Sequence, residues 1–278
     1  MTFVAIALSL TLTSGVRAQS AATDSAKTPG IQDNSFLIEE AYNQEAGVVQ
    51  HISALNIDRT NKSYEYDFTQ EWPAGGIAHQ LSYTIPLVHS AGSMSTGIGD
   101  VLLNYRYQLV GDGDAPLAVS PRFSVAFPTG DWKNDAGRGA AGYEGFLPVS
   151  IAVSNMLVTH LNAGARYTPS ARNASGDRAD VWKYALGGSE ILAISPTFNL
   201  MLETLWSREG DVVAPGKTRM STSWTISPGA RMALNYKSGL QIVPGIAFPL
   251  GIGPSRGERG VFLYLSFEHP FNDAGRKK

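Results

Sequence analysis

The stretch Tyr64-Glu-Tyr-Asp-Phe-Thr-Gln-Glu-Trp72 alternates between aromatic and acidic or polar side chains. Successive side chains of a β-strand point to opposite faces, so a period of two predicts a strand with two unlike faces. One face would carry Tyr64, Tyr66, Phe68 and Trp72, and the other Glu65, Asp67, Thr69 and Glu71. A half-buried soluble sheet also alternates, but here the apolar face carries no charge. This confinement of charge to one face is typical of a transmembrane β-strand with lipid on one side and a lumen on the other.

The same sorting recurs along the chain and predicts an up-and-down barrel. An even number of strands brings both ends of the chain to one side, as in bacterial single-chain barrels. Twelve strands are expected at residues 47–57, 64–73, 76–87, 97–110, 116–128, 143–154, 157–167, 181–195, 198–207, 222–236, 240–250 and 260–271. In the eighth, Glu190 would share a face with Trp182, which predicts a bulge near Gly187-Gly188.

Loop length also follows the barrel pattern, because such barrels have short periplasmic turns and longer outer loops. Short connections are expected at 74–75, 111–115, 155–156, 196–197 and 237–239, and longer ones at 58–63, 88–96, 129–142, 168–180, 208–221 and 251–259. The loop 129–142 either folds over the mouth or stays on the surface as a mobile loop. The fold class predicted is therefore all-β, an antiparallel up-and-down transmembrane β-barrel of about 12 strands.

Composition excludes several other classes of protein. After the N-terminus no apolar run approaches the ~18 residues of a membrane-spanning helix, and the mean hydropathy of the 278 residues is −0.08. The net charge of −2 is too small to indicate nucleic-acid binding. The absence of Cys excludes disulfides and thiolate metal sites.

The sequence predicts four regions along the chain. Residues 1–18 have the apolar core and small residues of a signal peptide, although no Lys or Arg precedes that core. Residues 19–46 form an N-terminal periplasmic or plug segment, in which Asp33, Asn34 or Ser35 could cap a short helix over 36–42. The barrel covers 47–271, and 272–278 form a C-terminal tail.

Aromatic residues on the lipid-facing side are expected to lie at the two ends of the strands. Such interfacial girdles mark the headgroup depth of a membrane. The outer girdle would contain Tyr64, Tyr167, Trp206 and Trp224, and the inner one Trp72, Tyr107, Tyr236 and Phe271. The predicted location is the bacterial outer membrane, with outer-membrane lipid as a partner.

Several motifs resemble one group of bacterial outer-membrane β-barrel proteins, known as transporters or as the meta-pathway phenol-degradation family. The likeness runs over about residues 31–271, and its motifs are Ile31–Glu45, Phe68–Pro73, His79–Pro86, Gly97–Val101, Ser120–Ser124, Phe127–Gly130 and Asn199–Glu203. The resemblance implies an outer-membrane channel for small molecules, hydrophobic or aromatic compounds among them. It also implies recognition of the terminal aromatic Phe271 by the barrel-assembly machinery, and the charged tail 272–278 departs from that pattern.

Charged residues on the inward faces are the candidate functional residues. They could line a water-filled pore and set its selectivity, or form a salt-bridged network that fills the barrel. The candidate lumen-lining residues are Glu65, Asp67, Glu71, Asp100, Arg106, Arg122, Arg166, Glu203, Arg231 and Glu268. Both signs of charge occur, so neither cations nor anions are preferred.

A catalytic function is a less well supported interpretation of the inward-facing residues than a pore. Ser150, Ser154, His160 and Asn162 are expected on inward faces, whereas outer-membrane lipid hydrolysis needs its nucleophile on the exterior. The other histidines show no metal-ligand spacing. We therefore predict no catalytic residues, no metal and no cofactor.

The function predicted is passive uptake or efflux of small molecules, with Ile31–Gln44 plugging or gating the periplasmic side. The alternative is a non-conducting structural or adhesion barrel that acts through its extracellular loops.

Overall fold

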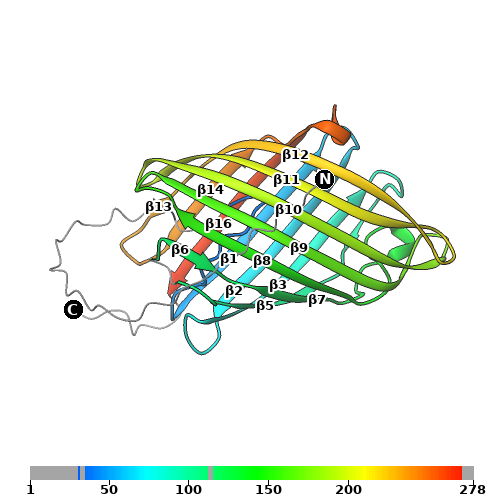
Figure 1. The fold of residues 1–278 in the computed structure, drawn as a ribbon, viewed down its shortest axis with the longest axis horizontal. Coiled ribbons are helices and arrows are strands. Elements are labelled where there is room, and N and C mark those ends of the chain that lie inside the picture. Colours follow the sequence, from blue (N-terminus) through cyan, green and yellow to red (C-terminus); the bar gives the residue numbers. More distant parts are fainter. Residues whose placement is uncertain (1–30, 32–34, 112–114, 271–278) are drawn as a thin grey trace, which may run out of the picture.

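The computed structural model describes residues 31, 35–111 and 115–270, and within these ranges the strands form one closed antiparallel sheet (Figure 1). Strand β1 pairs with β16 from Val48↔Pro270 to Asp58↔Gly260, and β14 pairs with β12. This circular pairing leaves no free sheet edge in the described part of the chain. The predicted twelve-stranded antiparallel barrel is confirmed.

Eight of the twelve spans in the described ranges are continuous strands, and four are interrupted. The continuous ones are β1 (Val48–Asp58), β2 (Ser63–Pro73), β3 (His79–Ser90), β8 (Gly142–Ala152), β9 (Leu157–Arg172), β10 (Arg178–Ser195), β11 (Phe198–Ala214) and β16 (Gly260–Pro270). The interrupted ones are β4 (Ser95–Ile98) with β5 (Leu102–Tyr107), β6 (Leu117–Val119) with β7 (Arg122–Ala126), β12 (Lys217–Met232) with β13 (Leu234–Asn235), and β14 (Gln241–Ala247) with β15 (Leu250–Gly251). Two of these breaks contain Pro121 and Pro249, which have no N–H to donate to a neighbouring strand.

The outer face of the barrel is apolar. Large hydrophobic side chains stay exposed on it, for example Leu103, Phe123, Leu147, Leu161, Leu186, Leu202 and Leu263. A soluble protein rarely leaves so continuous an apolar surface to water. This outer face is therefore the one that contacts the hydrocarbon of a membrane.

Helix is nearly absent from the described residues. It is limited to two 3-10 turns, η1 (Trp132–Asn134) and η2 (Gly253–Ser255). Neither is long enough to cross a membrane.

Strands β9 to β12 are longer than the sequence indicated, and two predicted long loops are wrong. Residues 168–180 and 208–221 are mostly strand, and only 173–177 and 215–216 remain as connections. The alternation continues beyond the expected ends because small apolar side chains pack on the inward face there. This cluster consists of Ala171, Ala179, Val181 and Val212. The third strand also begins later than predicted, at His79.

Two local predictions are wrong as well. The register of β10 with both neighbours is continuous through Gly187-Gly188, and its shifts lie instead between Ala179 and Val181 and between Ala193 and Ser195. Glu190 thus stays on the outer face, where it accepts a 2.8 Å hydrogen bond from Thr159 Oγ1. The predicted helix over 36–42 does not form.

Some predicted regions cannot be compared with the structure. The signal peptide 1–18, residues 19–30, Phe271 and the tail 272–278 lie outside the described residues.

Candidate functional site

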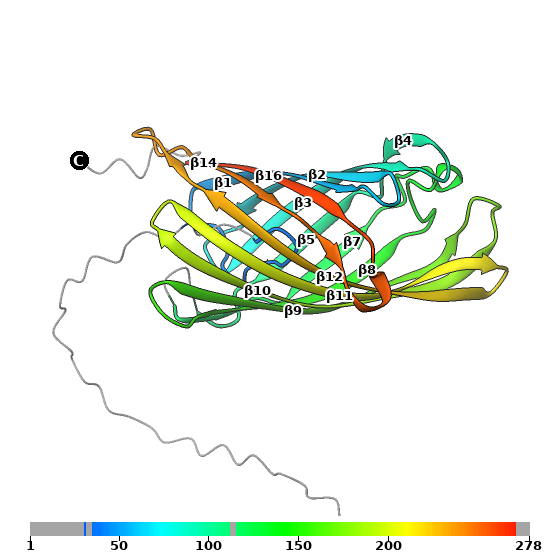
Figure 2. The ribbon, with the colours of Figure 1, turned by 90° about the horizontal axis from the view of Figure 1, so that it is seen from above.

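Residues 35–44, here called the inner segment, lie inside the barrel near the end where β1 begins and β16 ends (Figure 2). Their backbone is hydrogen-bonded to inward-facing side chains of the wall. The N–H groups of Phe36, Leu37 and Ile38 all donate to Glu203 Oε1, over 3.0, 3.0 and 3.2 Å. Three amides that converge on one carboxylate oxygen form a nest for an anion, and Glu203 on β11 supplies that anion.

The same arrangement continues along the inner segment. The N–H groups of Glu39, Ala41, Asn43 and Gln44 donate to Asn162 Oδ1 (2.7 Å), Ser150 Oγ (2.7 Å), Gln108 Oε1 (3.0 Å) and Gln80 Oε1 (2.7 Å). Asn162 stands on β9, Ser150 on β8 and Gln80 on β3, and Gln108 follows directly after β5. Because wall side chains satisfy the amides, the inner segment needs no helical hydrogen bonds, which explains why the predicted helix is absent.

Arginine side chains bind carbonyl groups of the N-terminal segment, both within the inner segment and at Ile31. Arg106 donates to the carbonyl oxygens of Glu40 (3.0 Å) and Tyr42 (2.6 Å) and, through Nε, to Asn43 Oδ1 (2.9 Å). Arg231 donates to the carbonyl oxygen of Ile31 over 3.2 Å. Two of the predicted lumen residues therefore anchor the N-terminal segment.

Glycines in the wall make room for the apolar side chains of the inner segment. Phe36 packs beside Phe262 and Tyr264, with ring centroids 5.5 and 5.2 Å away. A Cβ at Gly245 would lie 2.4 Å from the Phe36 ring, and one at Gly187 would lie 2.2 Å from Ile38 Cδ1. A larger residue at either position would collide with the inner segment.

An ion-pair network joins the inner segment to three strands. Arg122 Nη2 lies 2.8 Å from Glu39 Oε1 and 2.7 Å from Glu144 Oε1. Glu144 Oε2 in turn lies 2.9 Å from Arg166 Nε. Sequence reasoning named Arg122 and Arg166 but missed Glu144, although the alternation of Gly142–Phe146 places that carboxylate on the inward face.

The ten predicted lumen residues occupy different levels of the barrel. Arg106 and Glu203 contact the inner segment, Arg231 binds the carbonyl group of Ile31, and Arg122 and Arg166 belong to the network. Glu71 is buried and accepts a 2.8 Å bond from Gln80 Nε2. Glu268 lines a cavity at the inner end, and Glu65, Asp67 and Asp100, together with Arg166, line a cavity at the outer end.

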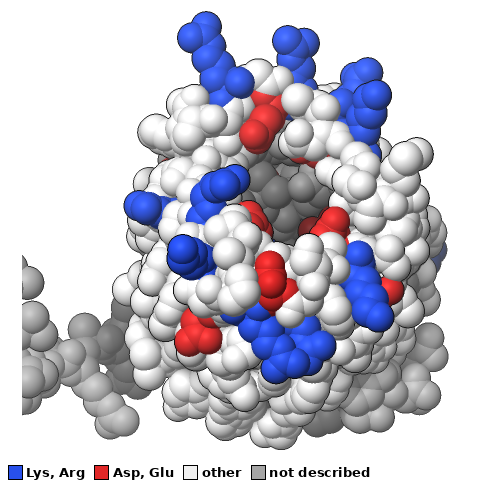
Figure 3. Space-filling view, turned by 90° about the vertical axis from the view of Figure 1, so that its right-hand side faces the viewer, with Lys and Arg blue, Asp and Glu red and all other residues white. Residues whose placement is uncertain are grey.

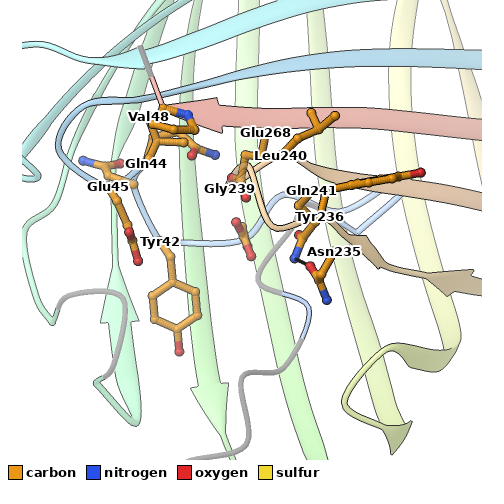
Figure 4. A pocket seen from close by; sticks show the side chains of 13 residues that line it. Tyr42, Gln44, Glu45, Val48, Asn235, Tyr236, Gly239, Leu240, Gln241 and Glu268 are labelled. Atoms are coloured by element: carbon orange, nitrogen blue, oxygen red, sulfur yellow. Dashed lines mark hydrogen bonds between the residues drawn. The ribbon is translucent and has the colours of Figure 1, made fainter. Parts of the chain in front are cut away.

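The inner cavity has a volume of about 320 Å³ and lies beside the inner segment (Figure 4). Tyr42, Gln44 and Glu45 line one side of it, and Asn235 and Gln241 of the β13–β14 hairpin line the other. The outer cavity is larger, about 710 Å³, and is lined by both acidic and basic side chains. Figure 3 shows the barrel hollowed at its outer mouth, with Lys, Arg, Asp and Glu around the opening.

The loop 127–141, here called the mouth loop, folds against the inside of the outer mouth. Asp100 accepts the N–H groups of Gly130 (3.0 Å) and Arg138 (2.8 Å). The Arg138 guanidinium pairs with Glu209 and Asp211 of β11. Of the two alternatives for this loop, the structure shows the folded one.

We expect Asp100→Ala to loosen the mouth loop. The change removes two charge-assisted hydrogen bonds, each worth about 1.5–3 kcal/mol. Limited trypsin digestion of the folded barrel should then cut faster after Lys133 and Arg138, which lie in the mouth loop.

Asp58→Ala is the matched control, because Asp58 accepts backbone amides of Thr60 and Asn61 in a different outer loop. Equal cleavage of the mouth loop in the two variants would show that Asp100 does not hold it.

The candidate catalytic side chains are used for structure. Ser150 Oγ lies 2.7 Å from His160 Nδ1, but it also accepts the N–H of Ala41, and both side chains are buried. The Asn162 side chain accepts the N–H of Glu39 and donates to the carbonyl oxygen of the same residue. Ser154 lies beyond the end of β8 and accepts turn amides, so its predicted inward position is wrong.

Comparisons with known proteins extend the description of the fold. No protein-family profile matches the chain, and no curated protein matches it. Among solved structures, the COG4313 outer membrane channel from Pseudomonas putida F1 is similar, with a TM-score of 0.62, 14% sequence identity, and 82% of this chain and 97% of that chain covered. The NanC porin is also similar, with a TM-score of 0.52, 11% identity, and 78% and 98% covered.

The chain thus has the fold of an outer-membrane β-barrel. A closed barrel satisfies its backbone hydrogen bonds within the sheet, and its outer face is apolar. These two properties place it in the outer membrane, as the sequence predicted.

Proposed function

We propose that this barrel is an outer-membrane channel through which small molecules pass without an energy source, and that the inner segment is its gate. The observation that carries the proposal is the way the inner segment is held. It takes part in no strand pairing and is fixed by wall side chains, between one cavity at the inner end and another at the outer end. Water replaces these hydrogen bonds when the inner segment leaves, so the net cost of opening is well below the gross strength of the bonds.

The solute class proposed from the resemblance is small hydrophobic or aromatic molecules. Membership of the transporter or phenol-degradation family is proposed on the same grounds. Pro86, Val88 and Trp132 line the outer cavity beside the charged groups, which gives the apolar part of such a compound a surface to contact.

The alternative of an adhesion barrel receives little support from the outer loops. Four of the connections at that end span only residues 59–62, 91–94, 173–177 and 215–216. The mouth loop is turned inward against β11, where it offers little surface to a partner.

Planar-bilayer recording tests the channel function. The full chain should give small, interrupted currents, and a variant that lacks residues 19–46 should give a larger and steadier conductance, because the gate is gone. Folding of both proteins is checked by the heat-dependent mobility of barrels in detergent gels. Folded protein that carries no current, even without residues 19–46, would contradict the channel function and support a structural barrel.

A further inference from the structure

The outer cavity has charges of opposite sign on opposite walls. Glu65 and Asp67 line it from β2, and Arg166 and Arg172 line it from β9. Around the barrel, β3, β5, β7 and β8 lie between these two strands on one side, and six strands lie between them on the other. The two pairs of side chains therefore face each other across a space of about 710 Å³.

Two carboxylates on β2, Glu65 and Asp67, form no ion pair within the described residues, and Arg166 acts on Asp67 only through the longer-range electrostatic field. Glu65 and Asp67 are two residues apart and share the inward face. Asp67 stands between Ala54 and Pro86, and Glu65 stands between Asn56 and Val88, so no basic residue lies directly opposite either carboxylate on the neighbouring strands. In the described ranges no ion pair joins either carboxylate to a Lys or Arg.

The basic wall retains two groups that can bind an anion. Lys183 and Arg138 are paired with acidic residues of β11. Arg166 contacts Glu144 through Nε. Arg172 lies over the Trp132 ring, 5.2 Å from its centroid, and forms no ion pair within the described part of the chain. No salt bridge crosses the cavity from this wall to Glu65 or Asp67.

We propose that the outer cavity binds small zwitterionic solutes, molecules that carry one ammonium and one carboxylate group. The ammonium group would bind at Glu65 and Asp67, and the carboxylate at Arg172 and Arg166. Fixed charges that face each other across a cavity produce a transverse field, which orients a dipolar molecule. An ion of one sign is attracted by one wall and repelled by the other, whereas a zwitterion is attracted by both.

Saturation-transfer NMR on the full chain in detergent micelles tests the site. The probes have similar size and different charge: 4-aminobutanoate, butylammonium, butanoate and butanamide. The zwitterion should bind about three- to fivefold more tightly than either singly charged probe, as expected for weak, solvated ion pairs.

Variants assign the two halves of the site. Glu65→Gln with Asp67→Asn should weaken binding of 4-aminobutanoate and butylammonium by about the same three- to fivefold and leave butanoate unweakened. Arg172→Gln should weaken 4-aminobutanoate and butanoate, and Arg172→Lys should restore them. Glu190→Gln is the control, because it removes a carboxylate from the outer face.

Two results would overturn the site. One is butylammonium binding that equals zwitterion binding and is indifferent to Arg172, which would mean selection by net charge alone. The other is no binding of any probe. Transport through the site rests on the proposed channel function, and liposome swelling with 4-aminobutanoate measures it separately. Binding without swelling would contradict the channel and confirm the site.

Discussion

Replacing Glu203 with alanine is expected to detach the inner segment from the barrel wall. The variant leaves the N–H groups of Phe36, Leu37 and Ile38, two of them buried and one half-buried, without their common acceptor. A hydrogen bond to a charged group contributes about 1.5–3 kcal/mol, and buried donors without partners are costly. A total of about 3 kcal/mol would lower the ratio of docked to free segment by roughly a hundredfold. Glu203→Gln keeps an acceptor without the charge and should have a smaller effect.

Hydrogen–deuterium exchange of the amides of residues 35–44 measures this release. Protection should fall by a similar factor in Glu203→Ala, and the bilayer conductance should rise toward that of the deletion variant. Glu190→Ala, which removes a carboxylate from the outer face of β10, should leave both readings unchanged. Unaltered protection in Glu203→Ala would mean that the remaining contacts hold the inner segment without this carboxylate.

Replacing Gly245 with valine is expected to expel Phe36 from its place in the wall. The first added carbon would already lie 2.4 Å from the Phe36 ring, which is rigid and packed beside Phe262 and Tyr264. The ring must therefore leave, at a cost of about 2–3 kcal/mol for its lost burial. Gly245 has no positive φ angle, so the substitution introduces no backbone strain of its own.

A glutamyl endopeptidase reports this displacement, because Glu39 and Glu40 lie in the inner segment. Cleavage there should be faster in Gly245→Val and unchanged in Gly145→Val, since a Cβ at Gly145 would meet nothing within 4 Å. Phe36→Ala removes the ring with which valine collides, so Gly245→Val should not speed cleavage further when it is added to Phe36→Ala. If Gly245→Val accelerated cleavage of Phe36→Ala as much as it does in the native protein, the steric explanation would be wrong.

The barrel could be predicted from sequence because lipid imposes a period of two on every strand. Tyr64, Tyr66 and Phe68 opposite Glu65 and Asp67 were sufficient to define the second strand and its faces. The ends of β9 to β12 could not be predicted, because beyond the membrane small residues such as Ala171 and Val212 pack inward and no longer differ sharply from their neighbours. Polar residues near 168–180 therefore suggested loops.

The candidate site was predictable in part. Inward Arg106, Glu203 and Arg231 follow from strand alternation, but their partners are backbone groups of Ile31 and of the inner segment, which no side-chain pattern reveals. The wrong helix over 36–42 has the same cause, because no side-chain pattern shows that wall residues bind the backbone of this segment. Period-two reasoning also missed Glu209, which pairs with Arg138 and Lys183 on a stretch that resembled a loop.

The side chains that contact the inner segment come from strands spread along most of the chain, from Gln80 on β3 to Tyr264 on β16. Synthesis makes this segment before any of those strands exist. Its binding surface is complete only when β14 and β16, which supply Gly245, Phe262 and Tyr264, have joined the sheet, so the segment that is synthesised first takes its place after the last strand. A chain truncated before Phe198 should leave the inner segment accessible to proteases. The inner segment therefore cannot close a barrel whose strands are incomplete.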